Sequence, residues 1–127
     1  MSDSRPRAVD GGVCIAIFQL RKDQKVRIGR LGQVRFREGF YFYVGSAQRN
    51  LSARLERHGR KEKPLSWHID YLSAKAEMLG AITIRGPREQ ECRIARKLAA
   101  MFDLAVGGFG ASDCRCGGHL FYSTALP

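Results

Sequence analysis

The stretch GFYFYVGSAQRNLSARLERH, residues 39–58, decides the fold of this chain. Its first half alternates, so that Tyr41 and Tyr43 project from one face of an extended strand while their neighbours project from the other. Gly45 ends the strand, because glycine permits the unusual dihedral angles of a tight turn. Asn50 is a favourable N-cap for the helix that follows. The stretch therefore predicts a strand, a turn and a helix in immediate succession.

The predicted helix sets a basic side chain beside the end of this strand. Leu51, Leu55 and His58 share one helical face at 3.6 residues per turn, and Arg54 lies beside them. The short connection places the hydroxyl of Tyr43 near the Arg54 guanidinium. We expect the rest of the chain to be organised around this strand end.

The other segments predict more strands than helices. Residues 13–20 are apolar on both faces, as in a strand at the centre of a sheet. The remaining expected elements are half-exposed strands or ribbon arms at 25–30 and 33–37, a short helix at 67–75 capped by Ser66, a strand at 78–85, a long helix at 88–102 and a last short strand at 119–124. Together they predict an α/β (α+β) fold in which a small, mainly antiparallel sheet of three or more strands is flanked by helices.

Length and charge narrow the classes of protein. A chain of 127 residues fits a single domain, which we place at residues 11–127 behind a flexible arm at 1–10. Lys and Arg number 22 against 12 Asp and Glu, a net charge of +10 that favours a polyanion, either nucleic acid or an anionic membrane surface. A basic surface that only keeps the protein in solution is the alternative. The absence of a long apolar run or a signal-peptide core predicts a cytoplasmic protein without a membrane partner.

Basic residues crowd the helix and loop after the central turn. Residues 49–63 hold six basic and two acidic side chains. Such a cluster tracks a nucleic-acid backbone or forms a solvated helical face, and both interpretations remain open. The candidates for backbone contacts are Arg49, Arg57, Arg60, Lys61 and Lys63. Trp67, just beyond them, is expected in the core rather than as a platform for stacking bases.

One carboxylate falls inside the apolar stripe of the long helix. Glu91 lies in line with Ala95, Leu98 and Phe102, whereas Glu89 lies on the polar side. An inward carboxylate must be paired, hydrogen-bonded or bound to a metal ion, because leaving it bare is costly. The pattern leaves open a metal ligand, a buried ion pair and a charge that favours the helix N-terminus.

The four cysteines are expected to be reduced thiols or ligands rather than a disulfide framework. Three of them fall in a group with a histidine: Cys92, Cys114, Cys116 and His119. A spacing of one residue between Cys114 and Cys116 is unusual for structural zinc sites, so structural thiols are favoured over a zinc centre.

Part of the central stretch keeps a characteristic spacing. The residues concerned are Tyr43-Val44-Gly45-Ser46, Asn50-Leu51, Arg54 and His58. This pattern resembles the second half of the GIY-YIG endonuclease signature. Further segments resemble one poorly characterised branch of that superfamily, whose members are sometimes fused to a DNA glycosylase of the endonuclease III type: Trp67 to Leu72, Glu91-Cys92, Phe109 to Cys114 and His119 to Tyr122. The resemblance covers residues 12–122.

The resemblance implies a metal-dependent endonuclease that hydrolyses phosphodiester bonds in DNA, structure-selective and linked to repair, with RNA not excluded. Carried over by residue, it implies that Tyr43 acts on the attacking water, Arg54 clamps the phosphate and Glu91 holds one Mg²⁺ or Mn²⁺ ion. His58 then tunes the tyrosine or contacts phosphate. One position departs from the family, because Cys14 stands where a tyrosine is usual. A thiol is a weak hydrogen-bond donor, so a binding module without turnover is the main alternative, and a zinc-stabilised interaction domain is the other.

Overall fold

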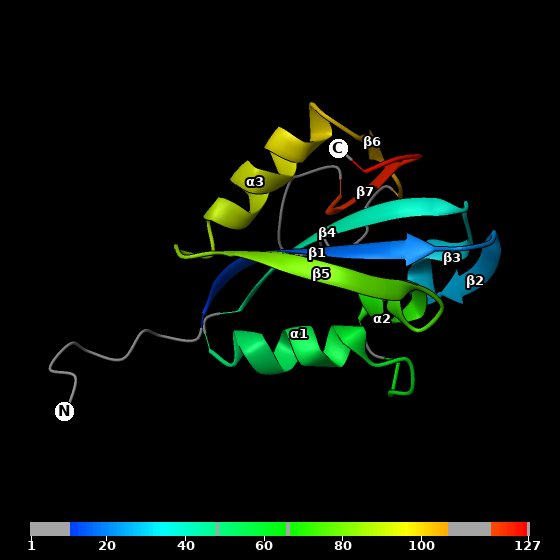
Figure 1. Ribbon diagram of the computed structural model, residues 1–127, viewed down its shortest axis with the longest axis horizontal. Helices are drawn as coiled ribbons and strands as arrows, with labels where there is room; N and C mark the ends of the chain where they lie inside the picture. Colours follow the sequence, from blue (N-terminus) through cyan, green and yellow to red (C-terminus); the bar gives the residue numbers. More distant parts are fainter. Residues whose placement is uncertain (1–10, 48, 66, 107–117, 127) are drawn as a thin grey trace, which may run out of the picture.

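The computed structural model describes residues 11–47, 49–65, 67–106 and 118–126. Five strands form one antiparallel sheet in the order β5-β1-β4-β7-β6 (Figure 1). They are β1 (Gly12–Leu20), β4 (Gly39–Ala47), β5 (Glu77–Ile84), β6 (Asp103–Leu104) and β7 (Leu120–Ser123). A separate two-stranded ribbon joins β2 (Gln24–Ile28) to β3 (Gly32–Phe36) through the 3₁₀ turn η1 (Gly29–Leu31). The expected α+β fold with a mainly antiparallel sheet is confirmed.

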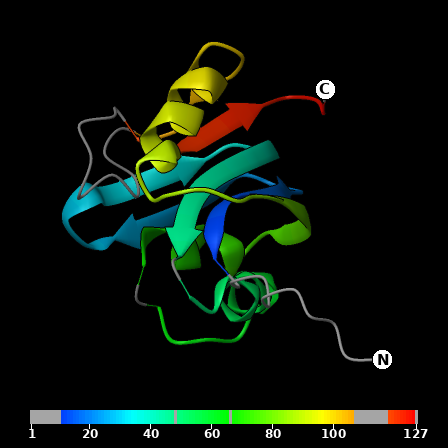
Figure 2. The same cartoon turned by 90° about the vertical axis from the view of Figure 1, so that its left-hand side faces the viewer.

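Helices cover both faces of the sheet. They are α1 (Leu51–Gly59), α2 (His68–Ser73) and α3 (Gln90–Ala99). Figures 1 and 2 show α3 on one face and α1 with α2 on the other, with the sheet between them. The chain therefore forms three layers in its described part.

The alternation in β4 divides the core as its sequence predicts. Tyr41 and Tyr43 belong to the cluster on the α1 and α2 face, whereas Phe42 and Val44 pack on the α3 face. Successive side chains of a strand point to opposite faces, so one strand supplies both cores. The position of β1 between β5 and β4 likewise confirms residues 13–20 as a central strand.

The end of β4 differs from the expectation. The strand continues through Ala47, because Gly45 pairs with Cys14 and Ser46 with Val13 of β1. Gly45 therefore marks a close approach of side chains inside a strand rather than a turn. A Cβ atom at Gly45 would lie 3.1 Å from Cε2 of Tyr43, tighter than most real contacts.

Helix ends also differ in detail. Asn50 is the N-cap of α1, but it adopts a left-handed conformation (φ 56°, ψ 37°) without a side-chain cap. The N-cap of α2 is Trp67, whose backbone N–H donates to Asp70 Oδ2 at 2.8 Å. Ser66 and the arm at 1–10 lie outside the described residues. The longest predicted helix, expected at 88–102, is shorter in the structure, where α3 spans residues 90–99.

Candidate functional site

Ser46, near the end of β4, joins the two helical layers. Its hydroxyl donates a 2.8 Å hydrogen bond to Oε2 of Glu91 on α3. Its backbone carbonyl accepts a 2.6 Å hydrogen bond from Nη1 of Arg54 on α1. The acid and the guanidinium predicted from distant parts of the chain therefore meet at one residue. The sequence did not predict this contact of Ser46.

The Glu91 carboxylate is held from two sides. Besides Ser46, the buried ring of His119 approaches it, with Nδ1 at 3.2 Å from Oε1. Burial alone would raise the pKa of Glu91. The hydrogen bonds from His119 and Ser46 together lower this pKa by more than burial raises it, so it lies below its usual value. Glu91 is therefore ionised at neutral pH, which is the state a metal ligand requires. The expectation that an inward carboxylate must be paired is confirmed.

Tyr43 and Cys14 both lie beside Gly45, on the face of the sheet that α1 covers. A Cβ at Gly45 would be 3.1 Å from the Tyr43 ring and 3.8 Å from Sγ of Cys14. Burial raises the pKa of both side chains, and the nearby Glu91 charge raises both further. At neutral pH the phenol and the thiol are protonated. The protonated phenol of Tyr43 can donate a hydrogen bond.

His58 lies behind Tyr43, away from solvent. Its side chain is 2 % exposed and meets the rings of Tyr43 and Trp67 edge-on, each with centroids 5.9 Å apart. Burial, and then the charge of Lys63, lower the pKa of His58 to about 4. A side chain this deeply buried does not reach a phosphate. Tuning of Tyr43 by His58 stays a prediction.

This depressed pKa predicts acid-sensitive stability. Between pH 6.5 and pH 4 the unfolded chain binds a proton at His58 and the folded chain does not, so the free energy of unfolding falls as the pH falls through this window. We expect a loss of about 3 kcal/mol from this residue between pH 7 and pH 4. Urea denaturation of the wild type and His58→Gln measures it, because the variant should lose that part of the slope. His68→Gln is the control, and an unchanged slope in His58→Gln would contradict the assignment.

A family model described as a domain of unknown function, DUF123, matches residues 13–126. The chain belongs to the DUF123 family. The match spans the whole candidate site, from Cys14 on β1 to His119 before β7. No curated protein and no solved structure matches the chain.

Two of the basic residues expected at a nucleic-acid surface of this DUF123 domain have internal partners instead. Arg57 forms a 2.6 Å ion pair with the buried Asp70. Lys63 donates to the carbonyls of Arg57 and His58 and to Ser73 Oγ, at 2.9, 3.2 and 2.6 Å. Lys63 thereby supplies hydrogen bonds to carbonyl oxygens in the last turn of α1, where partners within the helix are lacking. The exposed candidates are Arg49, Arg60 and Lys61.

Trp67 was expected in the core of the DUF123 domain, and this expectation is wrong. It is 40 % exposed, and the guanidinium groups of Arg54 and Arg57 lie over its ring, 4.8 and 4.7 Å from the centroid. Cation–π contacts of this kind restrict where an arginine points. Trp67 therefore helps to position Arg54, a role that no local sequence pattern indicated.

The cysteine cluster is brought together in part. Sγ of Cys92 lies 3.9 Å from Nε2 of His119, but Cys92 is disulfide-bonded, so the expectation of a reduced thiol is wrong there. Cys14 is free, and Cys114 and Cys116 lie outside the described residues. Over the described ranges, no group of three or more His, Cys, Asp or Glu side chains is arranged to hold a metal ion. A metal ion at Glu91 would rely on one protein carboxylate.

The helices of the DUF123 domain are short. Within residues 11–126, apart from the undescribed positions, none is both long and apolar enough to cross a bilayer.

Proposed function

We propose that the chain is a GIY-YIG-type, metal-dependent endonuclease that hydrolyses phosphodiester bonds in DNA. The observation that carries this proposal is the meeting of Arg54 and Glu91 at Ser46, with Tyr43 beside the adjacent Gly45. Phosphodiester hydrolysis needs an activated water and positive charge near the phosphate and the departing oxygen. A guanidinium, an ionised carboxylate and a phenol at one sheet end fit these needs, and the resemblance of residues 43–58 to the GIY-YIG signature supports the same assignment.

Glu91 has the properties of a ligand for one hard cation. Its side chain is 17 % exposed, and its pKa is below the usual value. Each carboxylate oxygen has two acceptor positions, so the contacts with Ser46 and His119 leave one on each oxygen. Mg²⁺ is bound by one or two carboxylates and keeps several waters, which suits this site. The ion, when bound, supplies a more acidic water and charge neutralisation at the phosphate.

The protein groups then have separate roles. Arg54 has five N–H donors, and one of them is used on Ser46, so others remain for a phosphate oxygen. Tyr43 donates a hydrogen bond and orients the attacking water, because its raised pKa keeps it protonated. Ser46 and His119 fix the orientation of the Glu91 carboxylate.

A binding module without turnover is the second candidate, and Cys14 is the observation that favours it. The thiol is 1 % exposed and shorter than a phenol, and burial raises its pKa, so it is protonated at neutral pH and does not reach as far as the missing tyrosine. In such a module the basic residues and Arg54 bind nucleic acid, while the water is not activated.

The test separates these candidates with one set of substrates. Purified protein is incubated with branched, flapped and duplex DNA and with RNA, in Mg²⁺, Mn²⁺ or chelator. We expect nicking of DNA that requires the metal ion and falls at least about 100-fold in Arg54→Ala. Arg93→Ala, an exposed arginine of α3, is the matched control. Salt-sensitive binding without cleavage on any substrate would reject the enzyme and support the module.

A further inference from the structure

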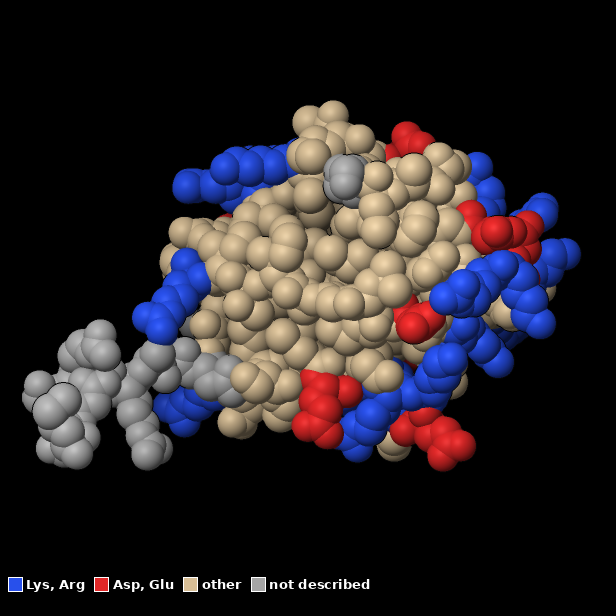
Figure 3. Space-filling model, in the orientation of Figure 1, with Lys and Arg blue, Asp and Glu red and all other residues tan. Residues whose placement is uncertain are grey.

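The ribbon formed by β2 and β3 has one basic face. Residues that pair directly across the two strands point to the same side, and successive residues of a strand alternate between sides. The ladder thus places four exposed side chains on one side, which we call the ribbon face: Lys25, Arg27, Gln33 and Arg35. Neither strand contains an acidic residue. Figure 3 shows Lys and Arg side chains gathered at the end of the molecule where Figure 1 places β2 and β3.

The opposite side of the ribbon packs on the core. Val34 and Phe36 of β3 are 9 % and 1 % exposed, and they belong to the same core cluster as Ile69 and Leu72 of α2. The ribbon is therefore held against the body of the domain, with its apolar side chains turned inward. Surfaces that bind a bilayer combine cations with exposed apolar side chains. The ribbon face lacks the apolar part, so it suits phosphates of a nucleic acid better than a membrane.

The charges of the ribbon face are not balanced within the described part of the chain. Lys25 lies directly opposite Arg35, and like charges at such positions destabilise a sheet. Asp23 pairs with Arg35 at 2.9 Å, but the Arg35 side chain is still 65 % exposed. Among the described residues, neither Lys25 nor Arg27 forms an ion pair. A bound polyanion would relieve the repulsion that the fold leaves in place.

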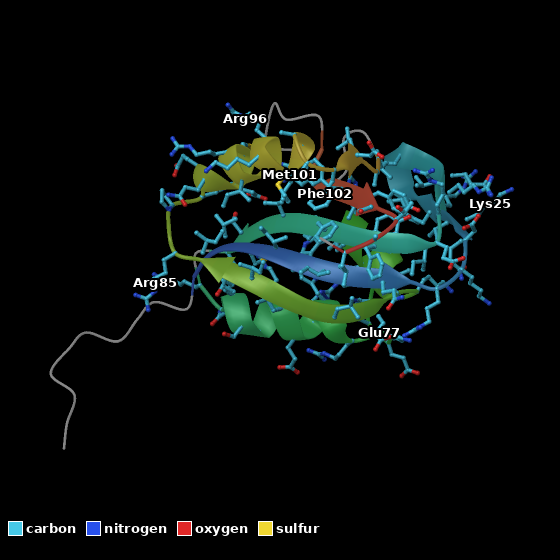
Figure 4. The ribbon with its side chains drawn as sticks, turned by 45° about the horizontal axis from the view of Figure 1, so that its top comes forward. Lys25, Glu77, Arg85, Arg96, Met101 and Phe102 are labelled. Atoms are coloured by element: carbon cyan, nitrogen blue, oxygen red, sulfur yellow. The ribbon has the colours of Figure 1, made fainter. Side chains whose placement is uncertain are left out.

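The ribbon lies at the end of the sheet opposite the candidate site. β4 begins at Gly39, shortly after the ribbon, and reaches Ser46 roughly 24 Å away at about 3.4 Å per residue. Figure 4 shows Lys25 and Arg85 at opposite ends of the molecule, and Arg85 follows β5 at the end where Val13 pairs with both β5 and Ser46. A duplex rises about 3.4 Å per base pair, so DNA must continue for about seven base pairs to span this distance.

We propose that the ribbon face binds the phosphate backbone of a duplex arm of the DNA that the endonuclease cuts. Since DNA is the partner in the proposed function, the ribbon contact rests on that function. Lys25 and Arg27 contact phosphate oxygens, and Gln33 donates its amide N–H to the same backbone. A duplex is stiff over this length, so it reaches both surfaces without the ordering that a single strand requires. The ribbon face thereby selects substrates with a duplex arm on its side of the cut.

Equilibrium binding in chelator tests the contact in the absence of cleavage. The probe is a fluorescent duplex of about 30 base pairs, titrated over a range of salt concentrations. The ribbon pair, Lys25→Gln with Arg27→Gln, should weaken binding at least about tenfold and reduce the slope of log affinity against log salt by about 2. Arg93→Gln with Arg96→Gln is the matched control, because it removes the same charge from exposed positions of α3 (Figure 4). Lys25→Arg with Arg27→Lys keeps both charges and should bind like the wild type.

Three results overturn the ribbon contact. Equal weakening by the ribbon pair and the control pair would show that only net charge matters. An unchanged salt slope in the ribbon pair would show that its cations meet no phosphate. Weaker binding of the ribbon pair to phosphatidylserine vesicles, with unchanged affinity for DNA, would assign the ribbon face to a membrane surface.

The outcome is separate from that of the nicking test. Metal-dependent nicking together with full DNA affinity in the ribbon pair supports the enzyme and rejects the ribbon contact. Binding that depends on the ribbon pair without any nicking rejects the enzyme and supports the contact.

Discussion

Glu91→Gln is expected to abolish metal-dependent cleavage, with a loss in rate of at least about 10³-fold. Glutamine keeps the size of the side chain and one oxygen that can still accept from Ser46 Oγ. It removes the negative charge that holds a divalent cation. The fold should therefore persist while the metal ion is lost.

Two measurements check this expectation. Single-turnover nicking over a range of Mg²⁺ concentrations gives the rate, and electron paramagnetic resonance of Mn²⁺ gives binding without reference to activity. Glu89→Gln is the matched control, because Glu89 is an exposed acid at the N-cap of the same helix. Full cleavage and Mn²⁺ binding in Glu91→Gln would place the metal ion elsewhere and remove the central part of the proposed mechanism.

Arg57→Ala is expected to lower the free energy of unfolding by about 3–5 kcal/mol. The Asp70 side chain is fully buried, and its Oδ2 accepts from Arg57 Nη2 at 2.6 Å and from the Trp67 backbone N–H at 2.8 Å. Removing the guanidinium takes away the positive charge 2.6 Å from this buried carboxylate. It also removes the hydrogen bond to the Pro64 carbonyl and the contact with the Trp67 ring.

Urea denaturation at neutral pH measures this effect. Arg60→Ala is the control, since Arg60 and Glu56 are exposed and 3.8 Å apart, and such a pair contributes about 0.5 kcal/mol or less. Adding Asp70→Asn to Arg57→Ala should recover part of the loss, because the second change removes the buried charge that Arg57 no longer balances. If Arg57→Ala costs no more than Arg60→Ala, the ion pair does not stabilise the junction of α1 and α2.

The parts of the fold that the sequence predicted depend on local periodicity. The alternation around Tyr41 and Tyr43 indicates two faces of a strand, because side chains alternate whatever the strand pairs with. The apolar stripe of α3 likewise shows that Glu91 points inward and needs a partner. These patterns are properties of the backbone geometry, so they can be read without the tertiary structure.

The parts that the sequence did not predict depend on partners far along the chain. The end of β4 is set by β1, whose Val13 and Cys14 extend the pairing through Ser46 and Gly45. His119 reaches Glu91 across 28 positions of sequence, and no spacing rule connects them. The internal roles of Arg57 on α1 and Lys63 in the following loop could not be told from those of solvated cations, because their partners are fixed only when α1 and α2 pack together.

The sequence by itself determined which residues line each face of the strands and helices, and it determined the antiparallel α+β class. It also showed that Glu91 needs a partner. Periodicity and the cost of a bare buried charge are both local effects, so neither depends on the tertiary structure. Only the tertiary structure decided that Ser46 joins Arg54 to Glu91, and that Tyr43 stays protonated beside them. Contacts and pKa values arise from side chains that folding brings together from separate strands and helices. The physical reason is that burial and Coulomb interactions depend on distance in space, which sequence separation does not specify.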